Sequence, residues 1–192
     1  MGIYTKGVGM KSNYNDLIRK TTILCTERLV LRRFNISDKE AVLAYGSDAE
    51  TLKYLIWPGI TDVEAAERVI MAYYSRPGVY ALTLKATNQC IGCLDIRVEP
   101  QHEKASFGYV LNRNFWNCGY MTEALKAILE LCFTKLELNR VEASHYVGNE
   151  GSGKVMQKSG MSYEGLSLQE VKIKGFFQDV VHYGITRAQY FG

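Results

Sequence analysis

The sequence lacks the features that mark membrane, secreted and nucleic-acid-binding proteins. It has no run of about 18 apolar residues, the length needed to span a bilayer, and its N-terminal stretch lacks the apolar segment of a signal peptide. Lysine and arginine number 23 against 20 acidic residues, so the net charge is only +3, and no basic run indicates nucleic acid or an anionic membrane as a partner. We therefore expect a cytoplasmic protein without either partner.

The cysteines and histidines show no pattern of a metal or disulfide site. The five cysteines are odd in number, and the chain is not a small secreted one, so we expect no disulfide framework. Cys90 and Cys93 have the spacing of a metal or redox pair, but residues three apart in a strand point to opposite faces. His102, His145 and His182 are scattered along the chain. We expect no metal site.

Length and composition indicate one domain. A chain of 192 residues that is 47% hydrophobic can bury a substantial core. Residues 1–24 have mixed polarity and no strong period, so we expect an N-terminal arm there, with a helical turn near residues 14–20. Residues 25–192 are expected to form the single domain.

A strand, a turn and a long helix between Ser106 and Glu137 organise the chain. Residues 106–111 are of strand type, and a helix is expected to open near Gly119. Its apolar residues follow one face of a helix, namely Leu125, Ile128, Leu129, Cys132, Phe133 and Leu136. Gly119 would let a ligand approach the backbone closely, and the free N–H groups of the first helical turn favour an anion, most often a phosphate.

The remaining pattern predicts a mixed order of strands and helices. Ser37 and Thr61 are each followed three residues later by a glutamate, which predicts two helix starts. In the second of these helices, Val63, Ala66, Ile70 and Tyr73 form the apolar face. The expected strands cover residues 28–34, 79–85, 90–98, 105–111, 140–147, 163–173 and 176–186, with further helical segments at 49–55 and 152–159. The fold class is therefore α+β, with a mixed sheet flanked by helices.

One motif in this order suggests nucleotide binding. Gly148 to Lys154 matches the phosphate-binding pattern G-x-x-x-x-G-K between a strand and a helix. Position 155 is a valine, so the hydroxyl group that would hold Mg²⁺ is missing, and Gly160 ends the helix early. We therefore expect no P-loop, although nucleotide binding remains an alternative to be tested.

The chain resembles the GNAT superfamily of acetyl-CoA-dependent N-acetyltransferases, and most closely its branch of ribosomal-protein N-terminal (alanine and serine) acetyltransferases. The resemblance covers roughly residues 26–186 and rests on the order of several short matches. These are Thr26–Arg33, Gly108–Leu111, Phe115–Ala124, Leu138–Ala143, Asn149–Ser152, Lys158–Met161 with Glu164 and Gly165, and Gly175 with Asp179. The resemblance implies a mostly antiparallel twisted sheet that is splayed at the coenzyme site.

The resemblance also implies where acetyl-CoA binds. The family's phosphate turn reads Q/R-x-x-G-x-G/A, and here only Gly119 of that pattern is kept. Met121 stands where the family has Gly or Ala and is expected to narrow the space through which the pyrophosphate approaches the turn. The implied pyrophosphate site is the turn and the first helical residues, Trp116, Asn117, Cys118, Gly119, Tyr120, Met121 and Thr122. Backbone groups of Tyr109, Val110 and Leu111 would hold the pantetheine arm and the thioester, one amide stabilising the oxyanion. Asn149 would bind a pantetheine amide.

The catalytic residues implied by the resemblance are Ser152 and Glu170. The tyrosine that serves many relatives as an acid is replaced here by Met156, so Ser152 is expected to donate to the departing thiolate, although it also fits a helix cap. The family's glutamate aligns with Val171, and its neighbour Glu170 would face the other way unless a bulge intervenes. A water chain to Glu170, Asp95 or His145 is the alternative route for the proton.

The acceptor stays open at this stage. A protein N-terminal α-amine is expected, with a small amine or an antibiotic as alternatives and a non-catalytic acyl-CoA-binding sensor as a further one. In this family, the turn at Trp57–Gly59 and the hairpin at Lys174 and Gly175 would surround the acceptor mouth, and no acidic cluster there marks a polycationic acceptor. Pairing of the late strands of two copies would give a homodimer, which the sequence does not decide.

Overall fold

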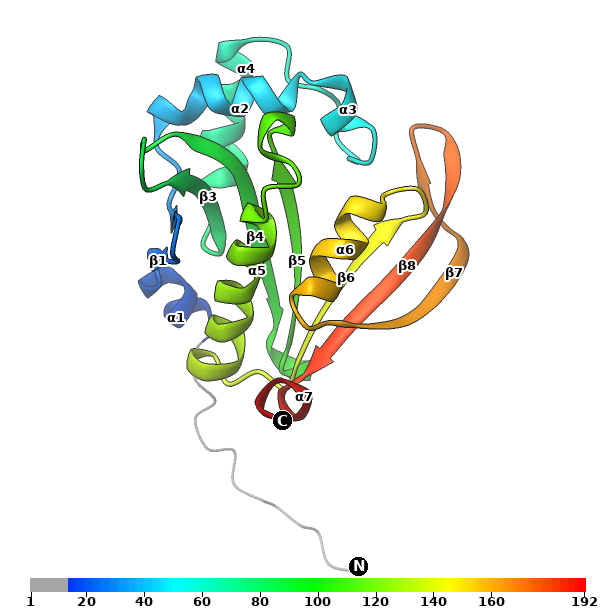
Figure 1. Ribbon diagram of the computed structural model, residues 1–192. Helices are drawn as coiled ribbons and strands as arrows, with labels where there is room; N and C mark the ends of the chain where they lie inside the picture. Colours follow the sequence, from blue (N-terminus) through cyan, green and yellow to red (C-terminus); the bar gives the residue numbers. More distant parts are fainter. Residues whose placement is uncertain (1–13) are drawn as a thin grey trace, which may run out of the picture.

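An eight-stranded sheet forms the centre of the structure, a computed structural model that describes residues 14–192 (Figure 1). The strands lie in the order β1-β2-β3-β4-β5-β6-β8-β7, and every neighbouring pair is antiparallel except β5 and β6. Their bounds are β1 Ile23–Cys25, β2 Leu29–Arg32, β3 Val79–Leu84, β4 Cys90–Glu99, β5 Lys104–Leu111, β6 Arg140–Tyr146, β7 Ser162–Ile173 and β8 Phe176–Thr186. The predicted α+β class with a mostly antiparallel sheet is confirmed.

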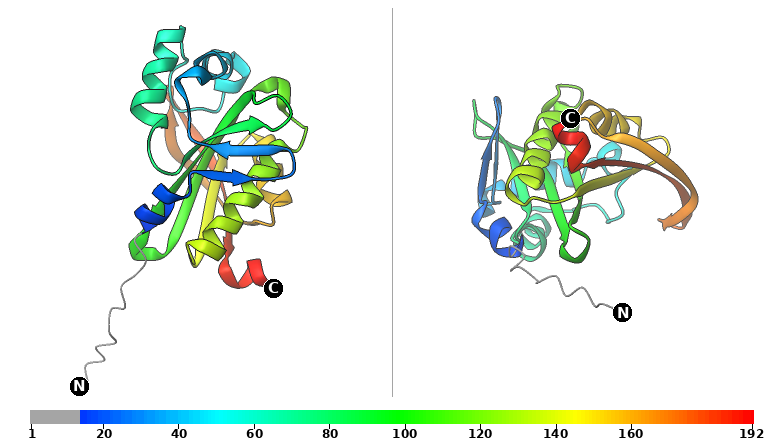
Figure 2. Two further views of the ribbon diagram at one scale, coloured as in Figure 1. Left: turned by 90° about the vertical axis from the view of Figure 1, so that its left-hand side faces the viewer. Right: turned by 90° about the horizontal axis from the view of Figure 1, so that it is seen from below.

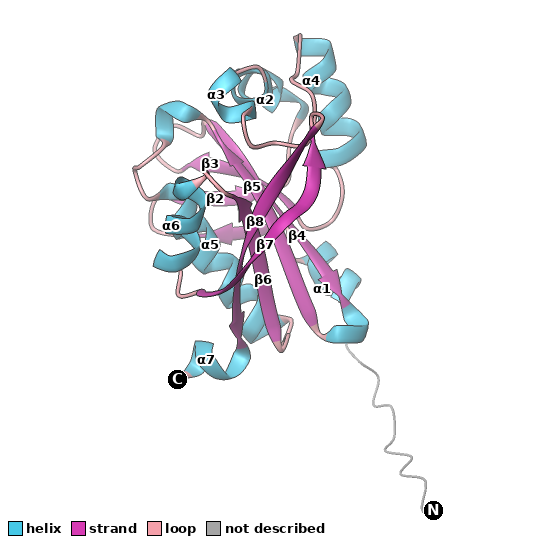
Figure 3. Cartoon of the chain, turned by 90° about the vertical axis from the view of Figure 1, so that its right-hand side faces the viewer, coloured by secondary structure: helices cyan, strands magenta, loops and turns pink. Residues whose placement is uncertain are grey.

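Helices cover both faces of this sheet (Figure 3). They are α1 Tyr14–Lys20, α2 Lys39–Gly46, α3 Ala49–Leu52, α4 Val63–Val69, α5 Tyr120–Glu130, α6 Glu150–Lys158 and α7 Arg187–Phe191. One hydrophobic cluster includes buried residues of α5 and α6, and a second joins α2 and α4 to Cys93 and Val110 of the sheet. Residues of both clusters, Met156 of the first and Cys93 and Val110 of the second, line the cavity described below.

The apolar stripe predicted for the long helix is confirmed. Leu125, Ile128, Leu129, Cys132, Phe133 and Leu136 are each at most 1% exposed. The helix continues beyond α5 as a π-helical segment at Leu131–Lys135. This buried stripe packs the helix into the main core of the molecule.

Three local predictions were wrong. The helical segment beginning at Ile36 is capped by Asn35 rather than Ser37, because Asn35 and Asp38 form the reciprocal capping box. Helix α4 is capped by Asp62 rather than Thr61, since the Asp62 carboxylate accepts from the Ala65 amide at 2.6 Å. Tyr73 is 59% exposed, because a π-helical segment at Ile70–Tyr74 shifts the helical phase, and Tyr74 packs inward instead.

The N-terminal segment joins the domain from Tyr14 onward. Residues 1–13 of the predicted arm lie outside the described part of the chain. Helix α1 buries Tyr14 and Ile18 in the main core, and β1 pairs with β2. In the structure, this part of the predicted arm is therefore packed against the domain.

The parallel strands β5 and β6 separate along their length. They pair only through three residues of β5, Lys104 to Ser106, although β5 continues to Leu111 and β6 to Tyr146. Beyond Ser106 the two strands diverge, with α6 following β6 (Figure 1). The sheet is therefore splayed at its centre, as expected.

The hairpin of β7 and β8 lies at the end of the sheet opposite β1. It curves away from the body of the molecule when seen from below (Figure 2, right). Strand β7 is last in the strand order, so among the described residues its outer edge has no neighbouring strand. Pairing of late strands between two copies stays a prediction.

Candidate active site

A cavity of about 850 Å³ lies at the splayed part of the sheet. Residues of the segment between α3 and α4 line one side, including Trp57, Pro58 and Gly59. The other side consists of residues from β5, β6 and α6, among them Tyr109, Asn149 and Ser152. The cavity thus connects the expected acceptor mouth with the expected thioester site.

Strand β5 directs part of its backbone into the splay. In an antiparallel ladder, alternate residues bond to the neighbouring strand and the others face away. The Asn112 amide bonds to Ile91 of β4, whereas the Leu111 carbonyl accepts from the Trp116 indole at 2.7 Å. The backbone of Asn112 therefore faces β4, and the backbone of Leu111 faces away from it. Tyr109 lies two residues before Leu111, so its N–H group also faces away from β4, toward β6. Tyr109 and Val110 line the cavity, as the coenzyme prediction requires, and Leu111 is buried behind them.

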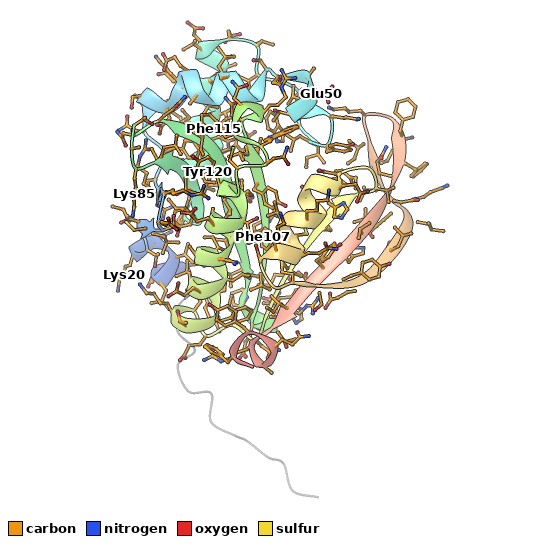
Figure 4. All side chains as sticks on the ribbon, viewed as in Figure 1. Lys20, Glu50, Lys85, Phe107, Phe115 and Tyr120 are labelled. Atoms are coloured by element: carbon orange, nitrogen blue, oxygen red, sulfur yellow. The ribbon has the colours of Figure 1, made fainter. Side chains whose placement is uncertain are left out.

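The predicted phosphate turn is exposed and leads directly into α5. Trp116, Asn117, Cys118 and Gly119 are all exposed, and Gly119 has φ of +81°, a conformation that L side chains rarely adopt. Tyr120 begins α5 and is labelled with its neighbour Phe115 in Figure 4, their ring centroids 6.3 Å apart. Thr122 lies half-buried in the first turn of α5.

Met121 does not narrow this turn, contrary to expectation. Its side chain is 4% exposed and belongs to the main core cluster. A side chain that points into the core leaves the outer surface of the turn to the backbone. The loss of the family's small residue at this position is therefore compatible with an open anion site.

Asn149 and Ser152 face the splay from the start of α6. The Asn149 carboxamide oxygen accepts from the Ser152 amide at 3.3 Å, so the cap of α6 is Asn149 and the reading of Ser152 as the cap was wrong. An asparagine keeps two donors on its nitrogen, which suits the predicted contact with a pantetheine amide. The Ser152 hydroxyl lies in the first turn of α6, at the cavity wall.

A hydrogen bond across the splay connects β5 with α6. The hydroxyl group of Tyr109 donates to the Ser152 carbonyl oxygen at 3.2 Å. Burial raises the pKa of Tyr109 to about 12, so this hydroxyl stays protonated near neutral pH. Sequence reasoning considered only the backbone of Tyr109, because the position of its side chain depends on how β5 and α6 pack.

His145 packs beneath α6. It is 7% exposed, its ring stacks on that of Tyr183, and a Cβ on Gly153 would lie 2.7 Å from its Nε2 atom. The close approach of α6 to β6 therefore requires a glycine at position 153.

Glu170 is not brought together with Ser152. Strand β7 does contain the irregularity that the sequence analysis considered, between Ser167 and Val171. The Glu170 carboxylate nevertheless binds His182 Nε2 at 2.7 Å, and Glu170 is not among the residues that line the cavity. Hydrogen bonds from Ser167 and His182 lower the pKa of Glu170.

Asp95 is the carboxylate that lines the cavity. It lies on β4 opposite Gly108 of β5, and its Oδ2 atom is 3.4 Å from Nη1 of Arg97. A Cβ on Gly108 would come within 2.7 Å of Asp95 Oδ1, so the glycine makes room for this carboxylate. From the sequence, Asp95 was expected only as one possible end of a water chain.

Two hydrogen bonds attach the cavity mouth to the rest of the molecule. Tyr54 donates to the Gly148 carbonyl at 2.6 Å, and Lys174 Nζ donates to the Leu52 carbonyl at 2.9 Å. The β7–β8 turn therefore reaches the α3 segment, as expected for a shared mouth. Gly148, the first residue of the P-loop-like motif, contributes its carbonyl to this contact.

Across residues 14–192, no cluster of three or more histidine, cysteine, aspartate or glutamate side chains could hold a metal ion. No helix among these residues is long and apolar enough to cross a membrane.

Comparison with known proteins agrees with this geometry. Residues 28–162 match the family model described as the acetyltransferase (GNAT) domain. An uncharacterized N-acetyltransferase, p20, of Bacillus licheniformis is 31% identical, over 88% of this chain and 98% of its own length. The crystal structure of a GNAT-family acetyltransferase from Bacillus anthracis has a TM-score of 0.80 at 27% identity, covering 87% of this chain and 99% of that one.

A second solved structure contains a bound coenzyme. A ribosomal L7/L12 α-N-protein acetyltransferase in complex with coenzyme A has a TM-score of 0.73 at 23% identity, over 85% of this chain and 97% of that one. At this identity, the likeness concerns the fold alone. The family model matches most of the chain, and p20 and the Bacillus anthracis enzyme match it over nearly their whole lengths. The chain therefore belongs to the GNAT family of acetyl-CoA-dependent N-acetyltransferases.

Proposed function

We propose that this enzyme acetylates the N-terminal α-amine of a protein. The observation that carries the proposal is the continuous cavity from Trp57 and Pro58 to Asn149 and Ser152. An acceptor that enters at the mouth would meet the thioester in the splay. A putative ribosomal N-acetyltransferase of Bacillus subtilis, 32% identical over half of this chain, supports a peptide acceptor, and the absence of an acidic cluster in the cavity lining argues against a polycation.

The proposed reaction is direct attack by the amine on the thioester. The amine nitrogen forms a bond to the carbonyl carbon while the carbonyl oxygen takes the negative charge. The N–H group of Tyr109 faces the splay and is the proposed oxyanion donor; such a donor contributes about 3–4 kcal/mol. Collapse of the intermediate breaks the C–S bond and leaves an amide and the coenzyme thiolate.

Ser152 is the proposed partner of that thiolate. Its hydroxyl group lies at the start of α6, where the helix dipole also favours a negative charge. The hydroxyl donates a hydrogen bond as the C–S bond breaks, and the thiolate then takes a proton to leave as the thiol. We expect Ser152→Ala to lower kcat about tenfold to a hundredfold and to leave KM for acetyl-CoA within about twofold, since a hydrogen bond to a charged group is worth about 1.5–3 kcal/mol.

Two carboxylates are proposed for the proton that the ammonium group must lose. Asp95 lines the cavity and accepts it directly or through one water molecule. Glu170 does not line the cavity and would act only through His182, to which it binds. His182 lies on β8 opposite Ser144 of β6, which does line the cavity. The geometry therefore favours Asp95 as the base.

The test is thiol release from acetyl-CoA with a panel of acceptors. The panel contains short peptides with varied N-terminal residues, the same peptides with a blocked α-amine, and small amines, and calorimetry measures acetyl-CoA binding on the same sample. Turnover confined to peptides with a free α-amine supports the proposal. Turnover with small amines alone overturns it, and coenzyme binding without any turnover would indicate the sensor alternative.

A further inference from the structure

Arg28 extends across the turn that leads into α5, although about 90 residues separate them in sequence. Its Nη1 atom donates to the Cys118 carbonyl at 3.0 Å. Its guanidinium carbon lies 4.4 Å from the centroid of the Tyr120 ring. Its Nη2 atom would be 3.4 Å from a Cβ placed on Gly119. One side chain thus contacts Cys118 and Tyr120, the residues on either side of Gly119 in the predicted pyrophosphate turn.

The same arginine holds the carboxylate of Glu123 in the first turns of α5. Arg28 Nε donates to Oε2 and the Arg28 backbone amide donates to Oε1, each at 2.7 Å. The Thr26 hydroxyl also donates to Oε1, at 2.5 Å. These donors belong to the segment before β2, which lies beside α5 (Figure 2, left). The carboxylate is therefore bound on the β2 side of the helix.

Glu123 remains charged in this environment. Burial raises its pKa, but hydrogen bonds from Thr26 and Arg28 outweigh burial, so the pKa lies below its ordinary value. A carboxylate near a helix N-terminus is stabilised by the same backbone N–H groups and dipole that would bind a diphosphate. Without a cation beside it, the Glu123 carboxylate would compete with the coenzyme diphosphate for these N–H groups and would repel the diphosphate.

We propose that Arg28 is a positioning residue for the coenzyme diphosphate, because it fixes the Cys118–Tyr120 turn and neutralises Glu123. The proposal rests on the proposed function and on the pyrophosphate site expected at this turn. The Arg28 side chain is 42% exposed, so it also adds positive charge at the surface where the diphosphate would arrive.

The proposal makes a specific prediction for Arg28→Gln. We expect KM for acetyl-CoA to rise about tenfold, which corresponds to about 1.4 kcal/mol, with kcat changed less than about threefold. Acetyl-pantetheine carries the same thioester but no diphosphate, so its KM should be the same for the variant and the wild type. Arg28→Lys keeps the charge and loses the forked geometry, so its KM for acetyl-CoA should lie between the two.

A second substitution separates this role from a merely structural one. In Arg28→Gln with Glu123→Gln, the repulsion disappears, so KM for acetyl-CoA should recover part of the way toward wild type. Arg33→Gln is the matched control, because Arg33 also binds a backbone carbonyl, that of Arg76 at 2.7 Å, and lies 5.7 Å from an aromatic ring, that of Tyr80. Its KM for acetyl-CoA should stay at the wild-type value.

The outcomes are distinguishable. An unchanged KM for acetyl-CoA in Arg28→Gln overturns the proposal, as does an equal loss with acetyl-pantetheine, or a double variant no better than the single one. If Arg28→Gln does not fold, the same comparisons are made with Arg28→Lys. Failure of wild-type protein to bind acetyl-CoA in calorimetry would instead contradict the coenzyme site itself.

Discussion

The Tyr109 hydroxyl group and the Ser152 carbonyl oxygen form a 3.2 Å hydrogen bond across the gap between β5 and α6. Strands β5 and β6 are no longer paired at this level, so this contact joins the two sides of the splay. It holds the first turn of α6, which also carries the Ser152 hydroxyl. The distance between the proposed oxyanion donor and the proposed thiolate partner therefore depends on this bond.

Removing the Tyr109 hydroxyl should lower activity more than stability alone explains. We expect Tyr109→Phe to reduce the free energy of unfolding by about 1 kcal/mol and kcat by about threefold to tenfold. Tyr183→Phe is the control, because its hydroxyl also binds α6, accepting from Gln157 at 2.9 Å, but at the other end of the helix. Denaturant unfolding and thiol-release assays on both variants should show similar losses of stability, with kcat lowered only by Tyr109→Phe.

The two proposed carboxylates can be separated by parallel amide substitutions. Asp95→Asn should lower kcat/KM for the acceptor about a hundredfold, since a general base contributes about 10² to 10⁴ in rate. Glu170→Gln should lower it less than about threefold, because Glu170 binds His182 outside the cavity lining. A larger loss in Glu170→Gln than in Asp95→Asn would assign the base to the Glu170 and His182 pair instead.

A methyl group at Gly153 should disturb the site, whereas one at Gly151 should not. The new Cβ in Gly153→Ala would lie 2.7 Å from Nε2 of the buried His145 ring, so α6 must shift, at a cost of about 1–3 kcal/mol. In Gly151→Ala, the nearest atom is 3.9 Å away, and alanine favours a helix over glycine by about 0.8–1 kcal/mol. Melting temperatures should therefore fall for the first variant and rise for the second. Equal melting temperatures for both variants would contradict close packing of α6 on His145.

The pair of Arg140 and Glu164 should contribute a stability that acid removes. Arg140 donates to both carboxylate oxygens of Glu164 and lowers the pKa of Glu164. A depressed pKa in the folded state gives stability that is present above the unfolded value, about 4.3, and is lost as the pH falls through the folded value.

The measurement is a double-mutant cycle with Arg140→Gln and Glu164→Gln at several pH values. We expect a coupling below about 1 kcal/mol at pH 7, since the Glu164 side chain is 36% exposed. The coupling should shrink as the pH falls below about 4. A coupling that grows in acid would contradict the assignment.

Local patterns predicted those parts of the fold that depend on local chemistry. The stripe from Leu125 to Leu136 follows directly from a helical period. The strand predicted at 105–111 from its β-branched and aromatic residues is found at Lys104–Leu111. The exposed turn at Gly119 was also predictable, because a helix was expected to open there. The strand, turn and helix on which the predicted coenzyme site depends are therefore sequence features that the structure retains.

The remaining parts depend on contacts between distant residues. Tyr73 was predicted to face the core because a uniform helical period was assumed, and the π-helical segment at Ile70–Tyr74 shifts that period. Glu170 depends on an irregular strand in which Gln169 has φ of +50°, which no pattern reveals. Asp95 enters the cavity because β4 and β5 pair in one particular register. The proton acceptor was therefore the weakest part of the sequence prediction.

The most direct test of the proposed function is thiol release from acetyl-CoA with one peptide in two forms, with its α-amine free and with that amine blocked. The peptide carries an internal lysine, so that both forms contain a side-chain amine. We predict thiol release only with the free α-amine, and mass spectrometry should place one acetyl group on the N-terminal residue. Equal release with the blocked peptide, or acetylation of the lysine alone, would contradict transfer to an N-terminal α-amine.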